Sequence, residues 1–97
     1  MMVLRFTKEA ARVLNELTSP QYAVKLRKVR RTLALIEQNP RHPGLNSHKY
    51  KSIRGVDGSD VWESYVENHT SGAWRIFWQY GPGEDTVTIL TIGPHPD

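Results

Sequence analysis

The sequence predicts an α+β domain with an N-terminal strand, a two-helix hairpin and then an antiparallel sheet of about four further strands. Apolar residues recur at helical spacing up to residue 38, the spacing becomes strand-like beyond residue 47, and short turn-rich segments separate the later strands. Short separators favour hairpins, so these strands are expected to run antiparallel. The chain has no repeat, low-complexity tract or linker-like stretch, so residues 1–97 are expected to form a single domain.

The N-terminal residues predict the strand and the first helix. Residues 2–6 are short and mostly apolar, which favours a strand. Thr7 can cap the helix that follows, with Glu9 in its first turn. One apolar face of this helix is formed by Ala10, Val13, Leu14 and Leu17. Ser19 and Pro20 then stand where the cap and the first residue of a second helix are expected.

The second helix is predicted to end before Asn39-Pro40, because the residue before a proline avoids the helical region. Its apolar stripe is formed by Tyr22, Leu26, Val29, Leu33 and Ile36. Two helices joined by so short a break predict an antiparallel hairpin.

Four strand-like runs follow a loop over residues 41–47. They are residues 48–54, 61–67, 73–80 and 86–92, separated by segments rich in turn-forming residues. In the third run, Trp74, Ile76 and Trp78 alternate with Arg75, Phe77 and Gln79, which predicts two distinct faces. One face of the sheet is expected to pack on the helices, which leaves the other face available.

Composition limits the possible functions. Cysteine is absent, which excludes disulfides and thiolate metal sites and suits a cytoplasmic location. The opening MMVLRFTKEA has no long apolar run, so neither a signal peptide nor a membrane span is expected. The four histidines lack zinc-ligand spacing, and neither a glycine-rich phosphate loop nor a nucleophile elbow occurs. An enzyme with this sequence is expected to use acid–base chemistry and charge stabilisation, with no metal or other cofactor.

Thirteen Lys and Arg residues against ten Asp and Glu give a net charge of +3, so the placement of the cations matters more than their number. Five of them crowd into the second helix, largely opposite its apolar stripe: Lys25, Arg27, Lys28, Arg30 and Arg31. This surface is either a solvated helix face or an electrostatic footprint for phosphates or an acidic partner.

A second basic set lies in the stretch SHKYKSIRG. Strand alternation predicts Lys49 and Lys51 on one face, and His48, Tyr50 and Arg54 on the other. Lysines on a strand often protect a sheet edge from pairing. Cations beside an aromatic ring also suit single-stranded RNA, because the charge meets phosphate and the ring meets a base.

Arg75 stands in AWRIFWQY, the most aromatic stretch of the chain. In a structural interpretation it stacks on Trp74 or Trp78, or pairs with Glu63 or Glu67 on the neighbouring strand. In a functional interpretation it is a bidentate phosphate clamp held by the sheet.

The closing TILTIGPHPD leaves a similar choice. The last residues of a domain often fray, yet prolines on both sides of His95 restrict the backbone and would hold its imidazole in place. A histidine near neutral pKa suits a proton donor at cellular pH.

The opening strand, the helical hairpin, the loop NPRHPGLNSHKYKSIRG, the strand WRIFWQY and the closing ILTIGPHPD together resemble the RelE/ParE toxin superfamily of bacterial toxin–antitoxin modules. The resemblance runs through the whole chain and implies two helices on a twisted antiparallel sheet. For the RelE branch it implies a metal-independent endoribonuclease that cuts mRNA in the ribosomal A site. There the 2′-hydroxyl attacks the adjacent phosphate. A cognate antitoxin is the implied protein partner, alongside mRNA and the ribosome.

The resemblance also implies roles for particular residues. Arg75 matches an arginine that contacts the scissile phosphate, and His95 looks like a C-terminal general acid. His48 lies near the position of an acidic or histidine base. The residues expected to bind RNA are Lys49, Lys51, Arg54 and Tyr50, with Tyr50 as a stacking or packing ring.

Pro96 and Asp97 stand where many nuclease members carry a terminal tyrosine. Two other functions therefore stay open. One is a non-enzymatic toxin of the ParE branch, which is associated with inhibition of DNA gyrase. The other is a repurposed member that only binds its antitoxin or nucleic acid. The sequence indicates no membrane partner and leaves the oligomeric state and the codon preference open.

Overall fold

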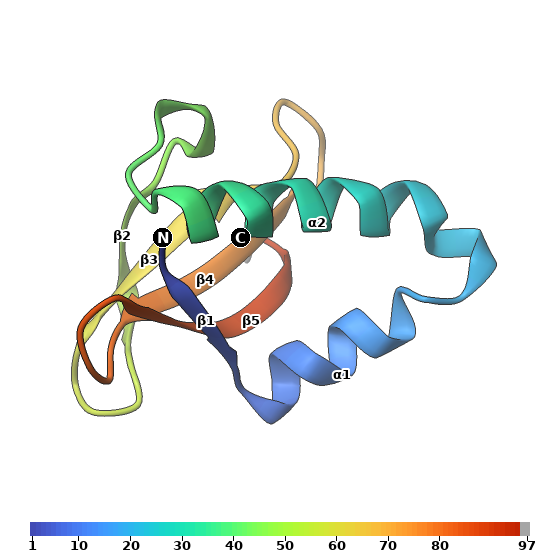
Figure 1. Cartoon of the computed structure of the whole chain (residues 1–97). Helices are drawn as coiled ribbons and strands as arrows, with labels where there is room; N and C mark the ends of the chain where they lie inside the picture. Colours follow the sequence, from blue (N-terminus) through green and yellow to red (C-terminus); the bar gives the residue numbers. More distant parts are fainter. Residues whose placement is uncertain (96–97) are drawn as a thin grey trace.

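The computed structural model describes residues 1–95 and contains a five-stranded sheet with two α-helices (Figure 1). The strands are β1 (Val3–Phe6), β2 (His48–Arg54), β3 (Asp60–Tyr65), β4 (Trp74–Tyr80) and β5 (Thr86–Pro94). The helices are α1 (Lys8–Glu16) and α2 (Ala23–Gln38), and the 3₁₀ turns η1 (Pro20–Tyr22) and η2 (Pro43–Leu45) precede α2 and β2. The predicted α+β class and order of elements are confirmed. Within residues 1–95, neither helix is long and apolar enough to cross a bilayer.

The sheet has the order β1-β5-β4-β3-β2. From β2 to β5 each strand pairs antiparallel with the next, as the short connections require. β1 instead pairs in parallel with the first half of β5, residues 3–6 opposite residues 86–89. Because β1 ends there, α1 continues beside the second half of β5, and the Thr7 hydroxyl donates to the Leu90 carbonyl at 2.6 Å. The sequence does not predict this parallel pairing.

The hydrophobic core lies between the helices and one face of the sheet. Its buried members are Ala10, Val13 and Leu17 on α1 and its C-cap, Val29, Leu33 and Ile36 on α2, Leu45 on η2, and Ile76, Trp78, Val87, Ile89 and Ile92 on the sheet. Ile36 is fully buried, so its replacement by alanine is expected to cost about 2–5 kcal/mol. Tyr22, predicted to belong to the apolar stripe, is 44% exposed because it lies in η1, before α2 begins.

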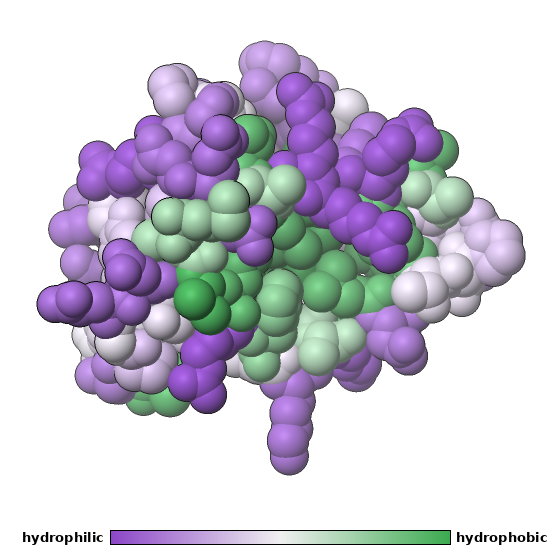
Figure 2. Space-filling view, in the orientation of Figure 1, coloured by the Kyte–Doolittle hydropathy of each residue, from purple (hydrophilic) through white to green (hydrophobic). Residues whose placement is uncertain are grey.

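The helices cover this face of the sheet. In the described residues no helix covers the opposite face of the sheet, which we call the open face. In Figure 1, α2 crosses on the viewer's side of the strands, with α1 below it. Figure 2, in the same orientation, shows an apolar area in the middle of the helical side, flanked by hydrophilic side chains. The predicted division of β4 into two faces is confirmed, since Ile76 and Trp78 join the core.

The helix ends match the predicted capping signals in part. The Thr7 hydroxyl accepts a hydrogen bond from the Ala10 N–H at 3.1 Å, as predicted. Ser19 forms no side-chain cap, because the chain after it turns as a 3₁₀ segment in which the Ser19 carbonyl accepts from the Tyr22 N–H. α2 ends at Gln38, as the proline at position 40 predicts.

The strand ends differ slightly from the prediction. β3 ends two residues early, because the N–H groups of Val66 and Glu67 both donate to the Trp74 carbonyl and close the turn to β4. β5 is longer than predicted and continues to Pro94. This extension carries the C-terminal segment alongside β4 and onto the open face.

Candidate functional site on the open face

A buried carboxylate on the open face meets two histidines. His48 begins β2 opposite Glu63 of β3, and its Nε2 lies 2.7 Å from Oε1 of Glu63. His95 follows β5, and its Nε2 lies 3.2 Å from Oε2 of the same carboxylate. The Glu63 side chain is 1% exposed, whereas the imidazoles are 49% and 40% exposed. The cluster therefore consists of a buried acid beneath two accessible imidazoles.

The backbone and the ring of His95 are both held in place. Its N–H donates to the Ala73 carbonyl at 2.9 Å, which continues the pairing of β4 with β5. Its ring meets the Tyr50 ring edge-on, with 6.1 Å between the centroids. The segment up to His95 is therefore anchored to the sheet. The second proline of the predicted restraint, Pro96, lies outside the described residues, as does Asp97.

Both ring nitrogens of His48 face oxygen atoms. Nδ1 lies 2.9 Å from the Asn46 carbonyl oxygen, and Nε2 faces Glu63. Asn46 adopts a left-handed conformation with φ 50°, at the end of η2. The His48 ring also meets the Tyr65 ring edge-on, at 5.9 Å.

Arg75 is buried beside this cluster, with 8% exposure, and lies opposite Tyr65 in the β3–β4 register. Its guanidinium carbon sits 3.8 Å from the centre of the Tyr65 ring. Nη1 donates to the main-chain carbonyls of Glu67 and Trp74, and Nε has no hydrogen-bond partner. The predicted stacking on Trp74 or Trp78 and the predicted carboxylate pairing are therefore wrong. The guanidinium of Arg75 instead lies over the ring of its cross-strand neighbour Tyr65.

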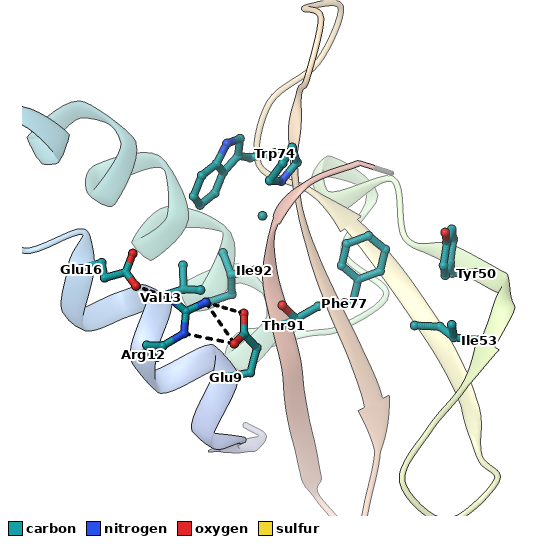
Figure 3. A pocket seen from close by; sticks show the side chains of 12 residues that line it. Glu9, Arg12, Val13, Glu16, Tyr50, Ile53, Trp74, Phe77, Thr91 and Ile92 are labelled. Carbon is teal, nitrogen blue, oxygen red and sulfur yellow. Dashed lines mark hydrogen bonds and ion pairs between the residues drawn. The ribbon is translucent and has the colours of Figure 1, made fainter. Parts of the chain in front are cut away.

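A groove of about 620 Å³ adjoins the cluster (Figure 3). Tyr50 and Phe77 lie on one side of β5, and α1 lies on the other, where Arg12 pairs with Glu9 and Glu16. Tyr50 packs edge-on against Phe77 at 5.1 Å and also meets His95. Tyr50 is thus shared by the cluster and the groove.

The predicted RNA-binding cations form a separate group at the edge strand β2. Nζ of Lys49 lies 3.2 Å from one oxygen of Asp60, and Nη1 of Arg54 lies 2.8 Å from the other. The hydrogen bond and charge of Lys49, aided by Arg54, hold the pKa of Asp60 below its usual value. Lys49 also lies over Trp62, which packs against the core, so it points away from Glu63.

Arg54 lies on the same side of β2 as Lys49, since both contact Asp60. The prediction that Arg54 shares a face with His48 and Tyr50 is therefore wrong. The register of β2 against β3 shifts between Tyr50 and Arg54, and the irregularity returns Arg54 to the side of Lys49. Lys51 is exposed on the same strand and makes no ion pair within residues 1–95.

Two lysines of the predicted basic helix face bind a second carboxylate, Glu67. Nζ of Lys25 lies 2.9 Å from Oε1, and Nζ of Lys28 lies 3.4 Å from Oε2. The Trp74 N–H also donates to Oε1, at 3.1 Å. Burial raises the pKa of Glu67, but the hydrogen bonds from Lys25 and Trp74 outweigh it and leave the pKa below its ordinary value. This contact ties α2 to the turn between β3 and β4.

Sequence reasoning missed Glu63 as a member of the site. It considered Glu63 only as a partner of Arg75. A signal was present, since strand alternation places the carboxylate of VWESY on the face opposite Trp62 and Ser64. Within residues 1–95, no three His, Cys, Asp or Glu side chains are arranged to hold a metal ion.

No protein-family model and no curated protein matches the sequence. Solved structures match over nearly the whole chain. The YoeB/ParE toxin from Agrobacterium tumefaciens has a TM-score of 0.74 at 12% identity, over 98% of this chain and 100% of that one. The YoeB dimer from Staphylococcus aureus has a TM-score of 0.71 at 14% identity, over 98% of both chains. The E. coli RelBE toxin–antitoxin complex has a TM-score of 0.65 at 15% identity, over 100% of both. The chain therefore has the RelE/ParE fold, as the sequence resemblance implies.

Proposed function

We propose that this chain, which has the fold of the RelE/ParE toxins, is a type II toxin that cuts mRNA on the ribosome and thereby inhibits translation. The observation that carries the proposal is the grouping of His95, Glu63 and Arg75 on the open face. A buried cation and an imidazole next to a carboxylate, beside a groove, are groups that a metal-independent phosphodiester cleavage can use for charge stabilisation and proton donation. The likeness to toxin structures supports the toxin role.

The proposed reaction is an internal transesterification. The 2′-oxygen forms a bond to the adjacent phosphorus while the bond from phosphorus to the 5′-oxygen breaks. The products are a 2′,3′-cyclic phosphate and a 5′-hydroxyl. Arg75 stabilises the charge on the phosphorane through Nη2, because its two carbonyl contacts in the described residues engage Nη1 alone. His95 donates a proton to the departing 5′-oxygen, and the 2′-hydroxyl proton passes to water.

His48 is the expected base in the sequence analysis. Both of its ring nitrogens already face oxygen atoms, so the proposed mechanism rests on Arg75 and His95. No metal or other cofactor takes part in the proposed steps.

The groove and the edge cations suggest a path for the RNA. A nucleotide next to the cleaved phosphate fits the groove, with its base against Tyr50 and Phe77. Flanking phosphates fit the cations of β2, namely Lys49, Lys51 and Arg54. Since Asp60 neutralises part of this charge, the cations assist binding and do not dominate it.

The proposed protein partner is a cognate antitoxin, acting in the cytoplasm. The E. coli RelBE structure is a toxin–antitoxin complex with this fold. On this chain, Tyr22 and Val24 are exposed apolar residues at the start of the second helical segment. Arg27, Arg30 and Arg31 are exposed farther along α2. An amphipathic segment with acidic residues is complementary to this surface.

Mapping of 5′ ends on mRNA in programmed ribosomes tests the proposed function. Purified protein is expected to cut in the A-site codon, and His95→Ala is expected to abolish the cuts, with His69→Ala as the matched control. An mRNA with a single 2′-deoxynucleotide at the cut position is expected to stay intact, because it lacks the attacking hydroxyl. Intact mRNA with a folded wild-type protein would contradict the proposal and favour the gyrase-binding or repurposed alternatives.

A further inference from the structure

A carboxylate as buried as Glu63 requires compensation, because an isolated buried charge is strongly unfavourable. β2 supplies His48, and the segment after β5 supplies His95. On β4 the cross-strand neighbour is the apolar Phe77, while the guanidinium of Arg75 lies over Tyr65 and donates to main-chain carbonyls. Among residues 1–95, the two imidazoles are therefore the groups that balance Glu63.

The contacts of His48 determine where its protons lie. A carbonyl oxygen only accepts, so Nδ1 of His48 carries a hydrogen toward Asn46. At 2.7 Å, Nε2 and the carboxylate oxygen also need a hydrogen between them, because two lone pairs would repel. The pair of His48 and Glu63 thus holds one shared proton and is neutral as a whole. Neither nitrogen of His48 is left to accept a proton from RNA.

His95 contacts the carboxylate differently. Its Nε2 lies 3.2 Å from Oε2 of Glu63, a buried oxygen that has no hydrogen-bond partner, so the two groups are in charge contact without a formed hydrogen bond. Nδ1 of His95 faces no hydrogen-bond partner in the described part of the chain. The ring is 40% exposed, and its backbone is fixed by the hydrogen bond to Ala73. A carboxylate that holds one nitrogen of an imidazole sets which nitrogen works on the substrate.

We infer that Glu63 is a positioning residue that holds His95 with Nδ1 toward the RNA, and that His48 is the counter-ion of Glu63 and not a base. This inference rests on the proposed cleavage of RNA and deepens it. Glu63 orients the imidazole of His95 through its contact with Nε2, so that Nδ1 is the nitrogen that donates to the 5′-oxygen. His48 keeps the buried carboxylate compensated throughout the reaction.

Histidine NMR tests the inference without RNA. Long-range ¹H–¹⁵N correlations of the wild-type protein at pH 7 are expected to show His48 protonated on both nitrogens. In Glu63→Gln, the ring ¹H and ¹⁵N signals of His48 and His95 are both expected to change, because the carboxylate that the two rings contact is lost. His42 and His69 are internal controls whose signals stay unchanged. A His48 ring that carries only one proton in the wild-type protein would overturn the inference, and this result requires no variant to fold. Unchanged His48 and His95 signals in a folded Glu63→Gln variant would overturn it as well.

Cleavage kinetics on programmed ribosomes test the same inference through its effect on rate. Glu63→Gln is expected to lower kcat by roughly 10–100-fold with KM nearly unchanged, a loss of the size seen when the partner that orients a metal-bound histidine is removed. His48→Gln is expected to cost less than about tenfold, far below the ~10²–10⁴ that loss of a general base costs. Glu84→Gln, at an exposed carboxylate outside the cluster, is the matched control.

Equal losses in His48→Gln and His95→Gln would overturn the inference, because they would make His48 a second catalytic group. The two experiments also separate the inference from the proposed function. A wild-type protein that cuts no RNA contradicts the function, while the NMR experiment still decides whether Glu63 holds the two imidazoles as inferred.

Discussion

Two carboxylates near the end of β3 differ in the kind of cation that meets them. Glu67 contacts two lysines of α2 and a main-chain N–H, whereas Glu63 contacts two imidazoles. Lysine keeps its charge throughout the neutral range, while an imidazole gains or loses a proton there. Structure and chemistry are thus divided between a strand and the turn that follows it. Glu67 fastens a helix to the sheet with fixed charges, and Glu63 belongs to a cluster whose proton can move.

Arg75 lies between these two regions, and its replacement should have the largest effect. It donates to the Glu67 carbonyl and rests on Tyr65, which touches His48. Arg75→Lys keeps a charge but lacks the planar fork, so single-turnover cleavage is expected to fall by about 10²–10³. Thermal unfolding followed by circular dichroism checks that the variant is folded. Cleavage within a few-fold of wild type would show that Arg75 serves packing alone.

Ser64 provides the structural counterpart of its neighbour Glu63. Its hydroxyl is buried and is bonded to Ser47 at 2.7 Å and to the Trp78 indole N–H at 2.8 Å. Ser64→Ala leaves that indole donor without its partner, so the free energy of unfolding is expected to fall by about 1–3 kcal/mol. Urea denaturation measures the loss. The cleavage rate of the folded variant should match wild type, and a large loss of rate would mean that both faces of β3 act in catalysis.

Glu67→Gln is expected to lower the free energy of unfolding by about 1 kcal/mol at pH 7, because it removes a partly buried ion pair. The pKa of Glu67 is held below its ordinary value of 4.5, so the carboxylate stabilises the fold above that pH. This stability is lost as the pH falls through the lowered pKa. Urea unfolding at several pH values should therefore show the gap between wild type and variant closing in acid. A gap that stays constant from pH 7 to pH 3 would contradict the assignment.

The two lysines of Glu67 should differ in their contributions. Lys25 lies closer to the carboxylate and also sits 4.7 Å from the centre of the Trp74 ring. Lys28 is more exposed and its contact is longer, at 3.4 Å. Lys25→Ala is expected to cost about 0.5–1 kcal/mol and Lys28→Ala less than about 0.5 kcal/mol. A double-mutant cycle with Glu67→Gln checks that each loss depends on the carboxylate.

The edge cations give the smallest expected effect. Asp60→Asn frees Lys49 and Arg54 to contact phosphate, so RNA binding should tighten slightly. The plot of the logarithm of the binding constant against the logarithm of the salt concentration should become steeper by about one unit. Binding titrations at several salt concentrations with a catalytically inactive variant measure both quantities. An unchanged slope would place the RNA path away from β2.

The sequence predicts the elements well because their signals are local. Thr7 caps α1 through its own hydroxyl, and the proline at position 40 ends α2 regardless of the rest of the fold. The parallel pairing of β1 with β5 depends on contacts more than 80 residues apart, which no local pattern encodes. The shift that moves Arg54 to the side of Lys49 depends on how β2 pairs with β3 and has no turn residue to mark it.

The candidate site was predictable only in part, for the same reason. The sequence pattern that resembles the RelE/ParE toxins singles out Arg75, His48 and His95 by residue type. The residues that they contact lie on other strands. Glu63 joins the two histidines because the register of β2, β3 and β4 brings them around one carboxylate. Strand alternation predicts which face of β3 carries Glu63. Its neighbours across the sheet can be identified only once the three-dimensional fold is known.

The rate of A-site cleavage as a function of pH, measured side by side for wild type, Glu63→Gln and Glu67→Gln, tests the central claim most directly. We predict that Glu67→Gln keeps the wild-type rate within about twofold at every pH where it is folded. Glu63→Gln should lose roughly 10–100-fold at neutral pH, with an altered pH profile. Equal losses and unchanged profiles in both variants would contradict the claim that only the carboxylate held by histidines acts in the chemistry.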